Sequence, residues 1–339
     1  MVLGRRFVLK NHFVGEPKRE DFDLVEEELP ALKENEILYH SLFLSVDPYM
    51  RPYTMRMTPP FTMIGSSVAE VEESRHPKFP KGSTIIILAG WVERGVVNPD
   101  KMGKDSPGNT LGGVMPCPDL GPSFSKSLLL GACGMPGNTA YFGFLELCNP
   151  QPGETVVVSG AAGAVGSLVG QIAKIKGCKV IGYAGDDDKC AWLKKIGYDE
   201  AFNYKKIGML ESLEKAAPKG VDCYFDNVGG EMTAAVMSKM NVRGRIAVCG
   251  AISHYNDKGG YTKVTDILPL AIQKELKIEG FLVGRWKARW VEGIKAMAAW
   301  VGSGQIQAKE TVVDGFDRMP EAFMGLFTGA NTGKMVVKS

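Results

Sequence analysis

Three glycines spaced as GxxGxxG, at positions 160, 163 and 166, lie in the segment SGAAGAVG. A dinucleotide-binding turn needs glycine where the backbone bends sharply, where it approaches the pyrophosphate, and where helix meets strand. The first amides of the helix then face the phosphates. The spacing is a variant of GxGxxG with alanine at the middle approach, and a strand-to-helix turn without a ligand can carry glycines too.

The sequence on either side of these glycines favours a dinucleotide. A valine-rich run, residues 155–159, precedes them and predicts a strand. Apolar residues at helical spacing follow them, at Val165, Leu168, Val169, Ile172 and Ala173. A glycine turn between a strand and an amphipathic helix, in the first of several such units, indicates a nicotinamide dinucleotide.

The choice between NAD and NADP depends on the end of the second expected strand, residues 178–183. An NAD site has an acidic residue there, about 20 residues past the glycines. Here small residues and Tyr183 fill that end, and acids come only afterwards, in GDDDK. Lys189 is close enough in sequence to meet a 2′-phosphate, although Asp186–Asp188 would oppose an anion, and an ordinary solvated lysine fits equally well. We therefore expect NADPH/NADP as the cofactor.

The secondary structure expected around these residues differs between the first and the later part of the chain. Up to about residue 120, short apolar segments broken by Pro and Gly predict an irregular β domain. From about residue 153, strands alternate with amphipathic helices, which predicts a doubly wound parallel sheet in an α/β fold. The expected strands are 155–159, 178–183, 221–226, 244–250 and 277–283. After residue 304, short strands around TVVDGF and KMVVK flank an expected helix and could rejoin the first domain.

Length and composition indicate how many domains to expect and which kinds of partner are excluded. The chain of 339 residues is longer than a single hydrophobic core usually supports, so two domains are expected. A net charge of +2 gives no field that would steer nucleic acid or an anionic membrane. The N-terminus does not resemble a signal peptide, and the most apolar window, 85–92, is too short to cross a bilayer. Seven irregularly spaced cysteines indicate reduced thiols in the cytoplasm, and the expected partner is a small molecule.

Seven segments, in the same order along the chain, resemble the prostaglandin reductases, also called leukotriene B4 12-hydroxydehydrogenases or alkenal reductases. These enzymes are zinc-independent members of the medium-chain dehydrogenase/reductase superfamily. The segments are SVDPYMR (45–51), MPGNTAYFG (135–143), AAGAVGSLVGQIAKIKGCKV (161–180), FNYK (202–205), CYFDNVGG (223–230), CGAISHYN (249–256) and GKMVVK (333–338).

The resemblance implies a GroES-like, irregular β-barrel catalytic domain built from both chain ends around a Rossmann domain. We expect the catalytic domain at 1–125, the Rossmann domain at 126–304, and a returning segment at 305–339. The implied reaction is NADPH-dependent reduction of the carbon–carbon double bond of α,β-unsaturated ketones and aldehydes, of the 15-keto-prostaglandin and lipid alkenal type. The resemblance also implies a homodimer, formed through the last Rossmann strand near Phe281.

The same resemblance assigns residues to the cofactor. Gly163, Ala164, Val165 and Gly166 match the pyrophosphate turn, and Lys189 and Tyr204 match the surroundings of the 2′-phosphate. The ribose and nicotinamide would be lined by Asn227, Cys249, Gly250, Ala251, Ile252, Ser253, Tyr255, Phe281, Leu282, Val283 and Asn331. Two departures stand out: Asp186 replaces a serine common in the family, and DKGGYTKVTDILPL replaces a proline-rich loop. The first bears on the choice of NADP and the second on the choice of eicosanoid.

The residue types present point to hydride chemistry without a metal. The chain has four histidines, no CxxC pair and no GxSxG elbow, so no local set of zinc ligands or activated serine is indicated. Hydride arriving at an enone places negative charge on the carbonyl oxygen, which a neutral hydrogen-bond donor stabilises. A tyrosine hydroxyl, with an ordinary pKa of about 10, can be that donor at pH 7. Tyr255 follows the expected strand 244–250 and is the first candidate, with a loop tyrosine facing water as the alternative.

The substrate side is less determined by the sequence. Tyr49 is the pocket candidate from the first domain, with Met135 and Trp286 as possible apolar lining, although core packing explains such residues at least as well. Asp226 is expected to cap the next helix, and neither it nor Asp222 is given a proton-transfer role. A quinone oxidoreductase on the same fold and a non-catalytic NADPH-binding structural protein remain as alternatives.

Overall fold

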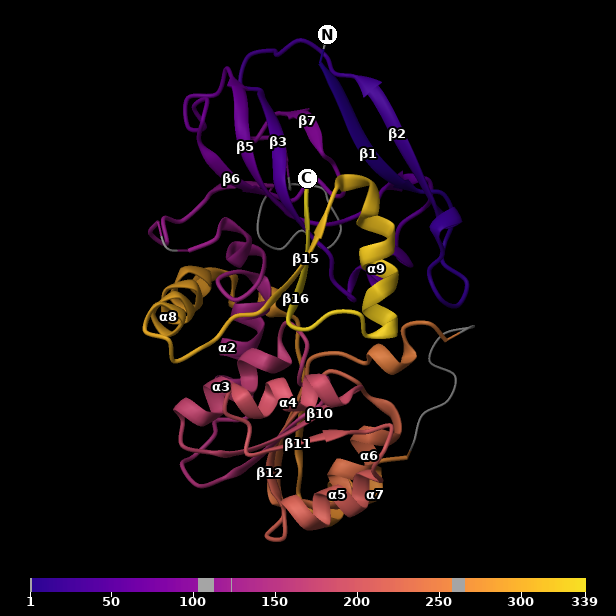
Figure 1. The fold of residues 1–339 in the computed structure, drawn as a ribbon, viewed down its shortest axis with the longest axis vertical. Helices are drawn as coiled ribbons and strands as arrows, with labels where there is room; N and C mark the ends of the chain where they lie inside the picture. The colour runs from indigo at the N-terminus through magenta and orange to yellow at the C-terminus, as the bar shows by residue number, and fades with distance from the viewer. Residues whose placement is uncertain (1, 103–112, 123, 258–265) are drawn as a thin grey trace. The chain divides into compact units, whose positions relative to one another are not determined.

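A computed structural model describes residues 2–102, 113–122, 124–257 and 266–339 (Figure 1). The chain forms two compact units. The first contains Met1–Leu130, Thr311–Ala330 and Met335–Ser339, and the second contains Gly131–Glu310 and Asn331–Lys334. Most of the segment DKGGYTKVTDILPL lies outside the described residues. Within the described ranges, none of the helices has the length and apolarity needed to cross a membrane.

The first unit is built mainly of antiparallel strands. One sheet has the order β2-β1-β4 and a larger one the order β15-β16-β3-β5-β6-β8, with β7 also pairing with β3. The strands are β1 (Leu3–Leu9), β2 (Phe22–Glu28), β3 (Ile37–Ser45), β4 (Phe61–Thr62), β5 (Ser67–Ser74), β6 (Thr84–Ile87), β7 (Arg94–Val97), β8 (Val114–Pro116), β15 (Glu310–Asp314) and β16 (Lys334–Lys338). Val336 pairs with Ser45, so the end of the chain completes a sheet begun near its start.

An aromatic core holds this unit together. Trp91 is fully buried, with Phe22 stacked 5.3 Å away and Phe323 edge-on at 5.7 Å. Phe323 comes from helix α9 (Met319–Thr328), which follows β15, whereas the other two rings come from the first hundred residues. The two ends of the chain therefore share one hydrophobic core. The short helices of the unit are η1 (Arg19–Asp21), α1 (Met50–Thr54), η2 (Lys126–Leu130) and η5 (Phe316–Arg318).

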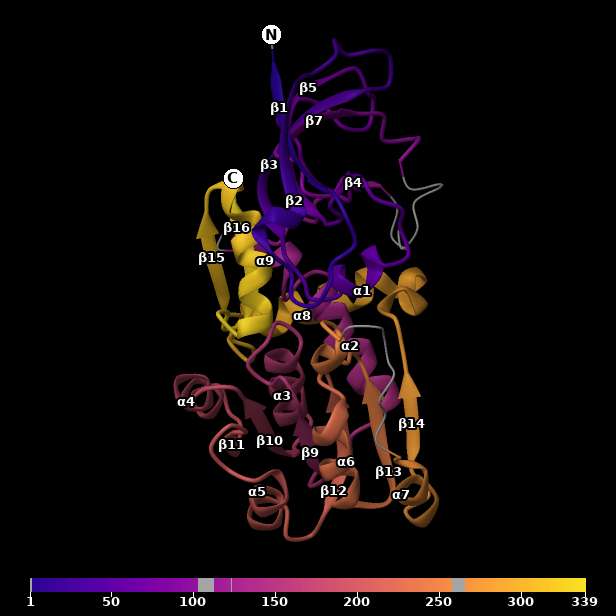
Figure 2. The same cartoon turned by 90° about the vertical axis from the view of Figure 1, so that its right-hand side faces the viewer.

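The second unit is a six-stranded parallel sheet with the order β11-β10-β9-β12-β13-β14, whose strands are best seen in Figure 2. This is the doubly wound Rossmann order, with the direction of winding reversing between β9 and β12. The strands are β9 (Thr155–Val158), β10 (Lys179–Ala184), β11 (Glu200–Asn203), β12 (Val221–Asp226), β13 (Met240–Val248) and β14 (Lys277–Gly280). The structure thus confirms the predicted fold class, a doubly wound parallel sheet with a separate β-rich unit.

Helices connect these strands. They are α2 (Met135–Leu147), α3 (Gly166–Ile175), α4 (Asp187–Lys195), α5 (Met209–Ala216), α6 (Gly230–Ser238), α7 (Leu268–Gln273) and α8 (Trp290–Gly302), with the short helices η3 (Ile252–His254) and η4 (Val283–Arg289). Strand β9 is entirely buried, as its run of three valines, Val156–Val158, predicts.

The sheet differs from the sequence expectation by more than two residues at three places, and by one or two residues at the ends of β9, β10 and β13. Strand β11 was not among the expected strands, because its four half-buried residues, EAFN, carry no β-branched side chain. Strand β13 begins at Met240 rather than 244, because its first four residues, MNVR, are too polar to predict a strand. Strand β14 ends at Gly280 rather than 283, because the ring of Phe281 leaves the sheet and packs against Gly143.

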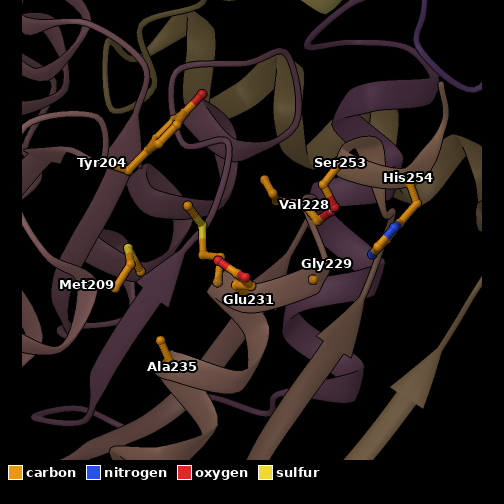
Figure 3. A pocket seen from close by; sticks show the side chains of 10 residues that line it. Tyr204, Met209, Val228, Gly229, Glu231, Ala235, Ser253 and His254 are labelled. Atoms are coloured by element: carbon orange, nitrogen blue, oxygen red, sulfur yellow. The ribbon is translucent and has the colours of Figure 1, made fainter. Parts of the chain in front are cut away.

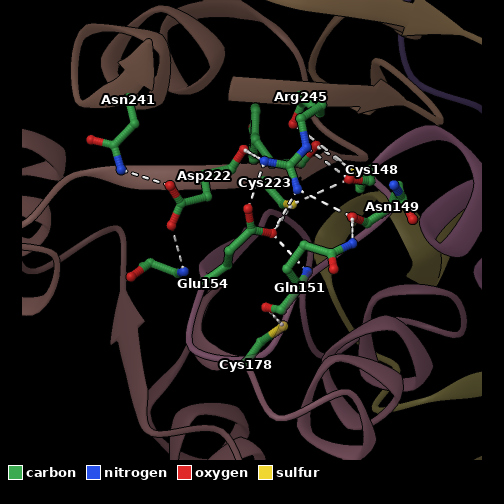
Figure 4. A network of polar contacts seen from close by, with 11 residues as sticks. Cys148, Asn149, Gln151, Glu154, Cys178, Asp222, Cys223, Asn241 and Arg245 are labelled. Carbon is green, nitrogen blue, oxygen red and sulfur yellow. Dashed lines mark hydrogen bonds and ion pairs between the residues drawn. The ribbon is translucent and has the colours of Figure 1, made fainter. Parts of the chain in front are cut away.

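An ion pair ties the middle of the sheet to the loop before β9 (Figure 4). The guanidinium of Arg245, on β13, donates to both carboxylate oxygens of Glu154, at 2.6 and 2.9 Å. It also donates to the backbone carbonyls of Cys148, at 2.8 Å, and Asn149, at 3.3 Å. Each side chain of the pair is only 21% exposed. Arg245 therefore donates hydrogen bonds both to the backbone carbonyls that follow α2 and to the carboxylate of Glu154, just before β9.

We expect Arg245→Met to lower the free energy of unfolding by about 3 kcal/mol at pH 7, because it leaves the Glu154 carboxylate half-buried and unpaired. Burial alone would raise the pKa of Glu154, but its hydrogen bonds from Arg245 and from the Gln151 N–H hold that pKa below its usual range. The pair therefore stabilises the fold above about pH 4.3 and loses this contribution as pH falls further. Urea unfolding should show the difference between the two proteins shrinking in acid, and a pH-independent difference would contradict this assignment.

Candidate functional site

The glycine-rich turn after β9 is closely packed against its own backbone. Gly160 adopts a left-handed conformation with φ of +56°, and its carbonyl oxygen accepts a hydrogen bond from Gly163 N at 3.0 Å. A Cβ atom at Gly166 would stand 2.5 Å from that same oxygen. The turn therefore folds back tightly and delivers the first residues of α3 to the carboxyl edge of the sheet, where backbone amides can receive an anion.

Tyr198 anchors helix α3 beneath this turn. Its ring lies against Gly170 and Gly182, where an added Cβ would come within 2.0 and 2.7 Å of it. Its hydroxyl donates to the carbonyl of Gly166 at 2.7 Å. The sequence analysis did not identify Tyr198. The signal that could have revealed such a neighbour is the pair of glycines inside a helix and a strand, which marks a close approach.

A segment from near the C-terminus lies against the glycine turn. Gly333 N donates to the carbonyl of Ala162 at 2.8 Å, and Gly333 forms a parallel bridge with Gly163. Asn331, a predicted cofactor residue, donates through its side-chain amide to the carbonyl of Gly333 at 2.8 Å. The structure thus brings Asn331 into the same unit as the predicted pyrophosphate turn.

The residues predicted near the 2′-phosphate also lie close together. Asp186 caps α4 by accepting the Lys189 N–H at 2.8 Å, and its other oxygen lies 3.6 Å from the Lys189 ammonium. Tyr204 follows β11 and is 45% exposed. Its hydroxyl would be 3.2 Å from a Cβ placed on Gly185, so it packs beside the end of β10. These three side chains therefore form one polar edge.

A pocket of about 630 Å³ opens next to this edge (Figure 3). Figure 3 shows Tyr204 on one side, Ser253 and His254 on the other, and Gly229 between them. Val228, which also lines the pocket, lies close to Gly160 of the glycine turn. An apolar, partly open pocket beside a dinucleotide turn suits the flat base of a nucleotide.

Asp226 organises the loops at the ends of β12 and β13. Its buried side chain accepts the backbone N–H groups of Val228, at 2.9 Å, and Gly229, at 3.0 Å, which lie in the loop before α6. The predicted capping role is wrong, because the N-cap of α6 is Gly229 and no side chain caps it. Its backbone carbonyl accepts the N–H groups of Cys249 and Gly250, at 2.8 and 3.1 Å. Burial, with a smaller effect of the Asp226 carboxylate, raises the pKa of the Cys249 thiol to about 12. This thiol therefore stays protonated at neutral pH.

Tyr255 ends the loop that follows β13. Its hydroxyl lies over Gly250, at 3.0 Å from where a Cβ would be, and accepts the Ala251 N–H at 3.4 Å. Accepting that bond uses a lone pair of the oxygen and not its proton. Asn227, whose carbonyl accepts the Ile252 N–H at 3.2 Å, is itself held by its side-chain bond to the Ser159 carbonyl at 2.7 Å. The tyrosine and the glycine turn are thus linked through one short set of loops.

The aromatic residues near β14 pack mainly into the second unit. Phe281 meets the Phe225 and Trp286 rings edge-on, at 6.1 and 5.6 Å. Trp286 is buried, stacks on Phe142 at 5.5 Å, and donates its indole N–H to Glu146 at 2.5 Å. These contacts give Trp286 the role of a core residue that holds η4 against α2. Beside them, Leu282 is 61% exposed and Val283 begins η4.

The two remaining pocket candidates lie in different units. Met135 begins α2 in the second unit and is half-buried. Tyr49 lies in the first unit, with its ring 5.1 Å from that of Tyr53. Burial, together with the charge of Asp47, holds the pKa of Tyr49 well above its usual range, so its hydroxyl keeps its proton. Among the residues that the structure describes, no three His, Cys, Asp or Glu side chains gather as metal ligands would.

Comparisons with known proteins agree with this arrangement. A family described as an N-terminal domain of oxidoreductases matches residues 5–104, and one described as zinc-binding dehydrogenases matches residues 164–299. Prostaglandin reductase 1 of Bos taurus is 46% identical over the whole of both chains. The NADP-dependent 2-alkenal reductase of Nicotiana tabacum is 39% identical, covering 99% of this chain and 97% of that protein. The crystal structure of CurA from Vibrio vulnificus in complex with NADPH is 36% identical, covers 99% of each chain, and superposes with a TM-score of 0.89.

Proposed function

The chain belongs to the prostaglandin reductase family of the medium-chain dehydrogenase/reductase superfamily, and from this we propose that it reduces the carbon–carbon double bond of α,β-unsaturated ketones and aldehydes with NADPH. The observation that carries the proposal is the Tyr255 hydroxyl, held by the loops at the carboxyl edge of the sheet that also carries the glycine turn. Ligands of doubly wound folds bind at this edge.

The residues present fit NADPH. The turn at Gly163–Gly166 folds back tightly, with no room for a Cβ at Gly166, and the start of α3 offers backbone amides to a pyrophosphate. Lys189 and Tyr204 would hold the 2′-phosphate, and the pocket beside Tyr204 would take the adenine. Asn227, Asn331 and the loop from Cys249 to Tyr255 would line the ribose and nicotinamide. When bound, NADPH supplies the hydride.

Tyr255 then acts on the substrate's carbonyl oxygen. As the β-carbon is reduced, negative charge collects on that oxygen, and a hydrogen bond donated by the Tyr255 hydroxyl stabilises it. The loop around Tyr255 is fixed before substrate arrives, because its backbone bonds run to Asp226, Asn227 and Val228. A donor that is already in place adds no reorganisation cost to the reaction. Water can supply the final proton on the α-carbon.

The direct test mixes the protein with NADPH or NADH and offers a 15-keto-prostaglandin, a short alkenal or a quinone, following absorbance of the reduced nicotinamide. We expect NADPH consumption with both enones and the saturated ketone or aldehyde as product. Consumption with the quinone alone would make the protein a quinone oxidoreductase. Tight NADPH binding without turnover of any substrate would make it a non-catalytic NADPH-binding protein.

A homodimer paired along β14 is part of the proposal. Strand β14 is the edge of the parallel sheet, and an exposed edge strand invites pairing with another chain. Apolar side chains stand out beside it: Ile278 is 38% exposed, and Leu268 and Ile272 of α7 are 68% and 77% exposed. We expect light scattering to give twice the chain mass, and Ile272→Glu to shift the protein towards monomer. A wild-type monomer at micromolar concentration would contradict this.

A cytoplasmic location also belongs to the proposal. It is supported by the seven cysteines, all of which are free thiols in the structure. Reduced thiols persist in the cytosol, where glutathione and thioredoxin oppose disulfide formation.

A further inference from the structure

Two side chains of opposite charge share the edge where the adenosine 2′-position would lie. Asp186 and Lys189 both stand at the start of α4, with Asp186 Oδ2 3.6 Å from Lys189 Nζ. Strand β10, which leads to them, pairs in parallel with β9, which leads to the glycine turn. The Tyr204 backbone N–H donates to the carbonyl of Ala184, at the end of β10, at 3.2 Å. Any ligand that extends from the glycine turn over β10 meets this pair.

The carboxylate is the more accessible of the two charges. The Asp186 side chain is 49% exposed, whereas that of Lys189 is 12% exposed. Its neighbour Asp187 is directed elsewhere, since its carboxylate is bound by the Asn203 side-chain amide, at 2.7 Å, and by Lys206. Asp186 therefore presents a negative charge at a place where a 2′-phosphate would need a positive one.

Asp186 stands just past the strand end at which an NAD-specific site carries its acidic residue. Strand β10 ends at Ala184, and Asp186 lies two residues later and about 20 residues past the last glycine of the turn. A carboxylate in that place accepts a hydrogen bond from the ribose 2′-hydroxyl of NADH. The same carboxylate repels a 2′-phosphate and offsets the Lys189 ammonium that would attract it.

We propose that Asp186 is a specificity-determining residue that lets this enzyme use NADH as well as NADPH. Its carboxylate binds the 2′-hydroxyl of NADH and weakens the attraction of the Asp186–Lys189 edge for the 2′-phosphate of NADPH. The inference rests on the proposed function, because it concerns the cofactor edge of that same site.

The test is Asp186→Asn, which keeps a side-chain oxygen for the helix cap and removes the charge. Asp186→Ser serves as a second variant, because serine also caps helices well. We measure kcat/KM for NADPH and NADH with one short alkenal, and Kd for each cofactor from the fluorescence of the bound reduced nicotinamide. The wild type should turn over with both cofactors, and both variants should raise the ratio of NADPH to NADH efficiency about tenfold. Added salt should reduce this gain.

The matched control is Asp188→Asn, which removes the same charge from an exposed residue on the same first turn of α4. It should change the ratio by less than about twofold, since an exposed charge further from the ligand is screened. The inference would be overturned if the wild type did not turn over with NADH, or if the variants kept the wild-type ratio of NADPH to NADH efficiency. Either result would leave the proposed function intact. Binding of neither cofactor to the wild type would overturn the proposed function, and the inference with it.

Discussion

Replacing Tyr255 by phenylalanine is expected to lower kcat for enone reduction by about a hundredfold or more, because loss of one oxyanion donor costs about 2.7 to 4 kcal/mol in the transition state. Affinity for NADPH should change little. The hydroxyl accepts a long bond, 3.4 Å, from the Ala251 N–H, and the loop is held by backbone bonds to Asn227 and Val228 that phenylalanine keeps. The variant should therefore fold and bind cofactor like the wild type.

The measurement is steady-state kinetics with a short alkenal, together with Kd for NADPH from nicotinamide fluorescence. Tyr141→Phe is a suitable control, since it removes a tyrosine hydroxyl that pairs with Glu292, outside the loops of the site. Wild-type turnover by Tyr255→Phe would exclude the hydroxyl as the donor. A loss confined to NADPH affinity would instead make Tyr255 a cofactor-binding residue without a role in the chemical step.

The sequence predicted the parts of the site that depend on local pattern. The glycine turn, the strand before it and the amphipathic helix after it produce strong periodic signals within 20 residues, and the structure has β9 and α3 there. The predicted capping role of Asp226 failed, because its carboxylate accepts the N–H groups of Val228 and Gly229 in the loop between β12 and α6, and Gly229 is the N-cap of α6.

The parts that escaped prediction depend on long-range packing. Nothing in the local sequence of Tyr198 shows that its ring will fit between Gly170 and Gly182, because those glycines come from a different helix and strand. The resemblance assigned Asn331 only to the lining of the ribose and nicotinamide. Its place beside the glycine turn follows from a segment that returns to the second unit just before the final strand. The sequence suggested Trp286 as possible pocket lining, with core packing as the alternative. In the structure its ring packs against Phe142 and Phe281 in the core.

Replacing Gly333 by alanine is expected to weaken NADPH binding by at least about tenfold, equivalent to about 1.4 kcal/mol. Gly333 has φ of +71°, in the region that glycine favours, and an alanine Cβ would stand 2.0 Å from the carbonyl oxygen of Lys309. That distance forces the segment Asn331–Lys334 to move. Its bonds to Ala162, at 2.8 Å, and to Lys309, at 2.9 Å, hold it beside the glycine turn, so the turn loses one of its supports.

Gly304→Ala separates this effect from backbone strain alone. Gly304 has nearly the same backbone conformation, with φ of +75°, but an added Cβ there would have no atom within 4 Å. Its alanine variant should lose about 1 to 2 kcal/mol of stability from the left-handed conformation and keep its affinity for NADPH. Unfolding in urea and NADPH titration of both variants give the comparison. Equal NADPH affinities in the two variants would show that the returning segment does not support the cofactor turn, because only Gly333→Ala displaces it.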